Sequence, residues 1–163
     1  MNAPLALSPT ALARIDREIA KYPLERKRSA VIAALAIAQD EKGWLSTETI
    51  EFVARYLDMA PVAVYEVATF YNMYNLAPNG KYKICICTNV PCALSGAVVA
   101  AEHLKQRLGV GFGETTADGR FTLKEGECFG ACGDAPVLLV NNKRMCGFMS
   151  PGAIDKLLSE LSE

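Results

Sequence analysis

Two cysteine pairs in the second half of the chain constrain its structure more than any other feature. Cys87 and Cys92 enclose the four residues TNVP, and Cys128 and Cys132 enclose the three residues FGA. Each pair is predicted to lie on a loop, the first between a strand and a helix and the second between two strands. Four cysteine thiolates are the usual ligand set of a [2Fe–2S] cluster. The sequence therefore favours a metal centre formed by two converging loops.

The spacing of the pairs separates several kinds of sulfur site. A [4Fe–4S] ferredoxin carries a C-x₂-C-x₂-C run, and none is present. Disulfide exchange of the thioredoxin type uses C-x-x-C at a helix N-terminus, and the first loop is two residues longer. Structural zinc accepts C-x₂₋₄-C spacing, so a zinc-stabilised interaction module without a redox role stays open as the main alternative. The wider spacing fits a binuclear cluster, which is bulkier than a single ion.

Glycines and acidic residues surround the second pair. Gly130 and Gly133 are expected to adopt positive φ angles and to direct their amides toward sulfur, although both residues are also compatible with an ordinary turn. Glu125, Glu127 and Asp134 add negative charge nearby, which is expected to lower the reduction potential of a bound cluster.

The other two cysteines and the single histidine are expected to have no ligand role. Cys85 lies within an alternating strand and Cys146 in another strand-like run, where unliganded cysteine usually packs as a small buried side chain. His103 lies on a helix between charged residues and is expected to be solvated. Because the chain has one histidine, a Rieske centre and a Cys₂His₂ zinc site, which each need two, are excluded.

Charge and composition exclude several classes of partner. Seventeen basic and eighteen acidic residues give a net charge of −1, which leaves no electrostatic footprint for nucleic acid or an anionic membrane. No apolar stretch approaches the roughly 18 residues of a membrane span. The first ten residues resemble neither a secretory signal nor a transit peptide, so we expect a chain that is cytosolic or already mature. In a reducing compartment, close thiols bind metal or do redox chemistry more often than they form structural disulfides.

The first half of the chain is predicted to form a small helical bundle. Ser8 and Pro9 begin a first helix, and a second is expected over about 27–41, ended by Gly43. Ser46 caps a third helix, and Pro61 begins a short fourth.

The second half is predicted to form an α/β layer. From Gly80 onward, apolar residues alternate with Lys83, Cys85 and Cys87, which is the period of a strand. The remaining elements are expected to be a helix over 94–108, a strand after Gly119, two strands turning at Asn141 and Asn142, and a last helix from Ser150.

Three segments carry a resemblance to a known family. The segments ATFYNMY at 68–74, CTNVPC followed by LSG, and ECFGACGDAP resemble the small [2Fe–2S] subunit of respiratory complex I, called NuoE in bacteria and the 24-kDa subunit in mitochondria. The resemblance extends from about residue 8 to residue 160. Jointly these motifs are specific, although each alone would be weak.

The resemblance implies an α+β fold and a ligand set. An N-terminal small helical bundle, residues 1–79, would precede a thioredoxin-like α/β [2Fe–2S] ferredoxin domain, residues 80–163. By motif match, the cluster ligands would be Cys87, Cys92, Cys128 and Cys132.

The resemblance also implies a function. Such a subunit transfers electrons within the NADH dehydrogenase module of NADH:quinone oxidoreductase, and its cluster exchanges single electrons with FMN on a larger, NuoF-like subunit that also binds NAD. The chain alone would contain no complete active site, and it would belong to the peripheral arm of a membrane-bound complex on the cytoplasmic side. Related subunits of NAD-linked formate dehydrogenases and NAD-reducing hydrogenases are equally compatible with the motifs.

The aromatic segment before the predicted domain junction has two interpretations. Phe70, Tyr71, Met73 and Tyr74 are residue types enriched at protein interfaces. They are equally suited to a hinge that packs into the second domain of its own chain.

Overall fold

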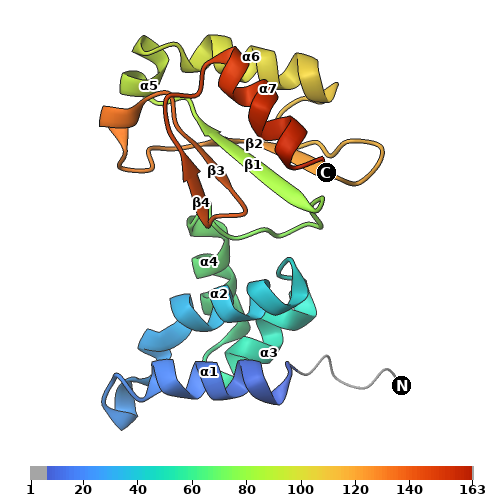
Figure 1. Cartoon of the computed structure of the whole chain (residues 1–163). Helices are drawn as coiled ribbons and strands as arrows, with labels where there is room; N and C mark the ends of the chain where they lie inside the picture. Colours follow the sequence, from blue (N-terminus) through green and yellow to red (C-terminus); the bar gives the residue numbers. More distant parts are fainter. Residues whose placement is uncertain (1–6, 163) are drawn as a thin grey trace. The chain divides into compact units, whose positions relative to one another are not determined.

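The chain forms two compact units, Met1–Pro78 and Asn79–Glu163, called here the helical unit and the sheet unit (Figure 1). The structure is a computed structural model that describes residues 7–162. Residues 1–6, on which the prediction of a cytosolic chain partly depends, lie outside the described residues. No helix within 7–162 is long and apolar enough to cross a membrane.

The described part of the helical unit is a bundle around one apolar core. Its elements are α1 (Pro9–Ile19), the 3₁₀ helix η1 (Leu24–Ala30), α2 (Val31–Lys42), α3 (Thr47–Leu57) and α4 (Pro61–Phe70). The side chains of Ser8 and Ser46 accept hydrogen bonds from the first turns of α1 and α3, as the cap pattern predicts. Ile15, Leu35 and Leu57 are at most 1% exposed in the core. The predicted helical bundle is therefore confirmed.

The second predicted helix begins later than expected. Residues 24–30 form the 3₁₀ helix, and Arg26 has a non-helical φ of −116°. Of this segment only Ala30 is buried, so the charged residues before it have no apolar face to pack against the bundle. An α-helix is stabilised mainly by such packing, and the regular helix accordingly starts at Val31.

A carboxylate of α2 holds the start of α1. The backbone amide and hydroxyl of Ser8 both donate to the Glu41 carboxylate, and Lys42 lies 3.2 Å from it. The hydrogen bond from the Ser8 hydroxyl is the main reason why the pKa of Glu41 lies below its usual value of 4.5. The ionised form of Glu41 thus stabilises the folded helical unit.

We expect Glu41→Gln to destabilise the full chain by about 1 kcal/mol at pH 7, because the bonds to a charged acceptor are weakened but partly screened by solvent. A carboxyl whose pKa is lowered by folding contributes stability above its unfolded pKa, and this contribution is lost as the pH falls through the folded value. The difference in melting temperature between the wild type and the variant should therefore shrink below about pH 4.5. Circular dichroism melts from pH 7 to pH 3 measure it.

Glu51→Gln is the matched control, since its carboxylate lies 3.8 Å from Arg55 on the surface of α3. An equal loss of stability in both variants at pH 7 would contradict a specific role for Glu41.

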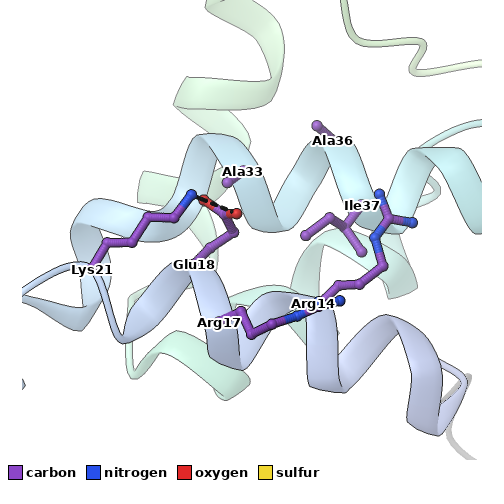
Figure 2. A pocket seen from close by; sticks show the side chains of 7 residues that line it. All are labelled: Arg14, Arg17, Glu18, Lys21, Ala33, Ala36 and Ile37. Carbon is purple, nitrogen blue, oxygen red and sulfur yellow. Dashed lines mark hydrogen bonds and ion pairs between the residues drawn. The ribbon is translucent and has the colours of Figure 1, made fainter.

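A groove of about 560 Å³ lies between α1 and α2 (Figure 2). Its lining residues are Arg14, Arg17, Glu18, Lys21, Ala33, Ala36 and Ile37. Lys21 pairs with Glu18 at 2.7 Å, and Arg14 lies 3.4 Å from Asp40. Much of the charge around the groove is thus matched within the helical unit, and its lining contains no cysteine.

The aromatic segment at the end of α4 is partly used within the helical unit. The Tyr74 hydroxyl donates to the carbonyl of Ile32 at 2.7 Å, and Tyr74 is 5% exposed. The Tyr71 ring meets Tyr74 and Phe70 edge-on, whereas Phe70 itself is 80% exposed. Tyr74 therefore packs in the core of the helical unit and not, as the hinge interpretation expected, into the second domain. Phe70 leaves the interface interpretation open.

The sheet unit is a mixed four-stranded sheet in the order β2-β1-β3-β4. Its strands are β1 (Tyr82–Cys87), β2 (Phe121–Gly126), β3 (Leu138–Val140) and β4 (Arg144–Cys146). Its helices are α5 (Val90–Leu94), α6 (Ala97–Leu108), the 3₁₀ turn η2 (Cys132–Asp134) and α7 (Pro151–Glu160). β1 is parallel to β2 and antiparallel to β3, and β3 and β4 form an antiparallel pair.

Alternation along the strands gives the sheet two different faces. Ile84 and Ile86 pack with Leu104 of α6 and Ile154 of α7 in one apolar cluster, so these helices cover one face (Figure 1). Because successive side chains point to opposite faces, Lys83, Cys85 and Cys87 point to the other. The predicted strand period thus assigns the cysteines of β1 to the face opposite the two helices.

The tight turn between β3 and β4 lies where the sequence places it. Asn141 and Asn142 both have positive φ, 52° and 57°, and Lys143 donates its amide to the carbonyl of Val140 at 3.0 Å. Three residues separate the paired Val140 and Arg144, and the first two of them are asparagines, which tolerate the left-handed conformation. The predicted turn is confirmed.

His103 is paired rather than solvated. Its Nε2 lies 2.9 Å from Oδ1 of Asp155, an oxygen that also accepts from Nε of Arg107 at 2.8 Å, and its side chain is 23% exposed. The hydrogen bond to His103 is the main reason why the pKa of Asp155 is lowered. The histidine therefore joins α6 to α7, and the expectation of a solvated ring is wrong.

Candidate metal centre

Cys87 is the last residue of β1 and lies at the end of the sheet. It is 2% exposed, and its amide donates to the carbonyl of Val137 at 3.0 Å. Gly126, the last residue of β2, is its partner across the parallel pair. Both parallel strands therefore end at the same level, and the two cysteine-bearing segments leave the sheet side by side.

Cys92 lies on a short helix and not at the end of a loop. The Asn89 side chain accepts from the amide of Val90 at 2.8 Å, and Pro91 occupies the first turn of α5. Asn89 as the cap and Pro91 in the first turn together form a helix-start signal, which the sequence analysis missed. Gly96, with φ of 96°, then separates α5 from α6, so the helix predicted over 94–108 is present but begins later, at Ala97.

The second pair lies on an exposed turn. The sulfur atoms of Cys128 and Cys132 are 3.7 Å apart, and both residues are exposed. Gly130 has φ of 77° and donates its amide to the Cys128 sulfur at 3.4 Å, as expected for a glycine in this loop. Gly133 does not have a positive φ, because it lies inside the 3₁₀ turn η2; that expectation is wrong.

The structure brings the two pairs into electrostatic contact. Burial is the main reason why the pKa of Cys87 is raised, followed by a hydrogen bond with Cys92 and the charges of Cys92 and Cys128. The pKa of Cys132 is raised chiefly by a hydrogen bond with Cys128, and also by the charges of Cys128 and Cys87. The ionisation of Cys87 and of Cys132 is thus opposed by thiols of both pairs, and bound metal cations would remove this opposition.

The distance within the exposed pair fits two ligands of one tetrahedral metal. A metal–sulfur bond of about 2.3 Å places two tetrahedral thiolates about 3.8 Å apart, close to the 3.7 Å between Cys128 and Cys132. Among residues 7–162, no three His, Cys, Asp or Glu side chains gather closely enough to ligate one ion. The distance between the Cys128 and Cys132 sulfur atoms thus suits two ligands of one iron in a binuclear cluster.

Two hydrogen bonds join the cysteine-bearing segments. The Thr88 hydroxyl donates to the Glu125 carboxylate at 2.6 Å, and the side-chain amide of Asn89 donates to the Glu127 carboxylate at 3.2 Å. Thr88 and Asn89 follow Cys87, whereas both carboxylates precede Cys128. These acids therefore hold the two segments together as well as adding negative charge to the site.

Apolar side chains close the inner side of the site. Cys87 and Cys92 pack with Ala97 and Val137, and Phe129 lies against this cluster. Our sequence analysis did not single out Phe129, although its position beside a ligand candidate and between two small residues was a usable signal. Cys87 and Cys92 are therefore shielded from solvent, whereas Cys128 and Cys132 are exposed to it.

Cys85 and Cys146 lie outside the two pairs. Cys85 is 8% exposed on the same sheet face as Cys87, and burial raises the pKa of its thiol. Cys146 is half-buried on β4 and packs against the main core of the sheet unit. Both positions agree with the packing roles predicted from the sequence.

This fold, with a parallel strand pair, helices on one face and two cysteine pairs at one end, defines a thioredoxin-like [2Fe–2S] ferredoxin. The family model described as thioredoxin-like [2Fe–2S] ferredoxin matches residues 15–162, and the chain belongs to this family. Both the predicted α+β class and the predicted family are confirmed.

Curated relatives are subunits of a respiratory enzyme. The chain is 48% identical over 125 residues to the NuoE-type subunit of the NADH-quinone oxidoreductase of Rickettsia prowazekii, covering 76% of this chain and 71% of the relative. It is 37% identical over 147 residues to the second subunit of the NADH-quinone oxidoreductase of Thermus thermophilus, covering 90% of this chain and 81% of the relative. An iron–sulfur role in an oxidoreductase complex is therefore supported.

A solved structure shows the same fold. The NAD⁺-reducing [NiFe]-hydrogenase in the air-oxidized state matches with a TM-score of 0.66 and 23% identity. The match covers 78% of this chain and 22% of the hydrogenase chain, so the chain spans about a fifth of that protein. At this identity the likeness concerns the fold alone.

Proposed function

We propose that the chain is the electron-transfer subunit of the NADH dehydrogenase module of NADH:quinone oxidoreductase. The proposal depends mainly on one observation: two pairs of cysteine thiols lie together at one end of the sheet. The chain is also closely related to subunits of that enzyme. The helical unit and the sheet unit would be two domains, with the cluster in the second.

The four ligands of the [2Fe–2S] cluster would be Cys87, Cys92, Cys128 and Cys132. When bound, the cluster supplies one-electron transfer, which side chains alone do not perform. Cys87 and Cys92 would hold it from a dry interior, and Phe129 would exclude water from that side. Cys128 and Cys132 would hold it at the surface, where a redox partner can approach.

The partner in this proposal is a larger, NuoF-like subunit that carries FMN and binds NAD. NADH delivers two electrons to the flavin, and the present chain would exchange them with it one at a time. The assembly would lie in the peripheral arm of the complex, on the cytoplasmic side of the membrane. The alternative is that the chain is the equivalent subunit of an NAD-linked formate dehydrogenase or an NAD-reducing hydrogenase, with a different partner.

Anaerobic purification of the full chain tests the cofactor. We expect a reddish-brown protein with about two irons and two acid-labile sulfides per chain, and with visible absorbance that dithionite bleaches. A colourless chain that holds one zinc ion would overturn the proposal and support the zinc-stabilised module.

Addition of the flavin-bearing subunit tests the assembly. NADH should bleach the chain when the flavin-bearing subunit of NADH:quinone oxidoreductase is present and should have no effect on the chain alone. If the chain is brown but is not reduced by NADH and this subunit, the proposed cluster would stand and the proposed partner would be wrong.

A further inference from the structure

Two lysines lie on adjacent strands beside the candidate metal centre. Lys83 in β1 is 3% exposed, and Lys124 in β2 is half-buried. Lysine is among the residues least often buried, because its ammonium group loses hydration. The two side chains thus place two ammonium groups within the sheet.

The register of the sheet brings these lysines toward Cys87. Lys83 and Cys87 point to the same face of β1, and Lys124 is the direct partner of Cys85, which lies between them. At about 3.3 Å per residue, the Lys124 backbone lies about 7 Å along the strand from the level of Cys87. Lys83 lies four residues before Cys87 on the same strand, which is about 13 Å along it.

The buried lysine still carries its charge at neutral pH. Burial is the main reason why the pKa of Lys83 falls to about 8, with a smaller contribution from the charge of Lys124. Burial also lowers the pKa of Lys124. A group with a pKa of about 8 is mostly protonated at pH 7, so this sheet face presents positive charge.

We propose that Lys83 and Lys124 raise the reduction potential of the cluster held by Cys87 and the other three ligands, an inference that rests on the function proposed above. Reduction adds one electron from the flavin-bearing partner, or from dithionite in vitro, and breaks no bond. It makes a site of four thiolates more negative by one charge. Nearby fixed cations stabilise this more negative state, and a partly buried site is weakly screened.

The lysines would counteract the acids on the other side of the site. Glu125 and Glu127 are anchored to the segment after Cys87 and favour the less negative, oxidised state. The reduction potential would then depend on the balance between the carboxylates of Glu125 and Glu127 and the ammonium groups of the two lysines.

A redox titration of the reconstituted full chain, monitored by EPR at pH 7, tests the inference. Lys124→Met and Lys83→Met remove the charge but keep an unbranched apolar stem. We expect each to lower the ratio of reduced to oxidised cluster about tenfold at the wild-type midpoint, which is a shift of about 59 mV to more negative potential for one electron. Lys124→Arg keeps the charge and should keep the wild-type midpoint.

Lys81→Met is the matched control. Lys81 precedes β1 at its far end, is exposed, and has its Nζ 5.1 Å from the centre of the Tyr82 ring. Its loss should leave the midpoint unchanged.

Three outcomes would decide against the inference or its basis. An unchanged midpoint in Lys124→Met with an intact EPR signal would overturn it, and so would an equal shift in Lys124→Arg. If the Lys83→Met variant fails to take up a cluster, the midpoint potentials of the two Lys124 variants decide the question alone. A wild-type chain without any [2Fe–2S] signal would instead refute the proposed function.

Discussion

The Cys92→Ala variant is expected to lose the [2Fe–2S] absorbance and EPR signal of the chain. Alanine supplies no ligand, and Cys92 lies in a dry position, 2% exposed, where water is excluded as a substitute. Loss of an outer partner of a metal ligand already costs about 10–100-fold in affinity, so loss of a ligand should reduce cluster content at least about tenfold. Iron and sulfide analysis after anaerobic reconstitution measures the loss.

The same loss is expected for alanine at each of the other proposed ligands, Cys87, Cys128 and Cys132. Cys85→Ala and Cys146→Ala are the matched controls, because they remove a thiol from the same unit without removing a proposed ligand. Both controls should retain a full cluster. If either control lost it while one of the four ligand variants kept it, the ligand assignment would be wrong.

The Gly126→Ala variant is expected to destabilise the sheet unit and reduce its cluster content. A Cβ at this position would lie 2.5 Å from Cζ of Phe129 and 2.7 Å from the Cys85 sulfur, both far inside normal contact distance. Inserting a methyl group into packed surroundings typically costs about 1–3 kcal/mol. The Phe129 ring would have to move, and with it the turn that carries Cys128 and Cys132.

Thermal melts and iron content measured on the same preparations test this prediction. The double variant Gly126→Ala with Phe129→Leu should recover part of the lost stability, because the shorter side chain vacates the occupied space. Gly152→Ala is the control, since no atom lies within 4 Å of its added Cβ and its φ is not positive. Wild-type stability and iron content in Gly126→Ala would refute the packing argument.

Local signals in the sequence predicted the element starts well. Ser8, Ser46 and Ser150 each accept a hydrogen bond from the helix that follows them, and these caps need no distant partner. The turn at Asn141 and Asn142 is local in the same sense. By contrast, the failure at residues 24–30 arose because apolar packing, and not periodicity, decides where a regular helix begins.

The candidate site was predictable in its residues but not in its geometry. Spacing and motif singled out the four cysteines, and their ligand role stays a prediction. The pairing of Cys87 with Gly126 depends on contacts between distant segments, which spacing within one motif does not encode. The short helix that carries Cys92 was missed because the Asn89 cap was overlooked. The ion pair of His103 with Asp155 was missed because the partner is distant in the sequence.

The two-faced strand β1 restricts how the gene can change in length. The side chains of Lys83, Cys85 and Cys87 point to the sheet face that bears the candidate ligand Cys87. Those of Ile84 and Ile86 pack in the core under α6 and α7. Inserting or deleting one codon before Cys87 would exchange the two faces, moving isoleucine to the metal centre and cysteine into the core. The exposed turn at residues 117–119 carries no such alternation, so gains and losses of residues should be tolerated there better than in the strand.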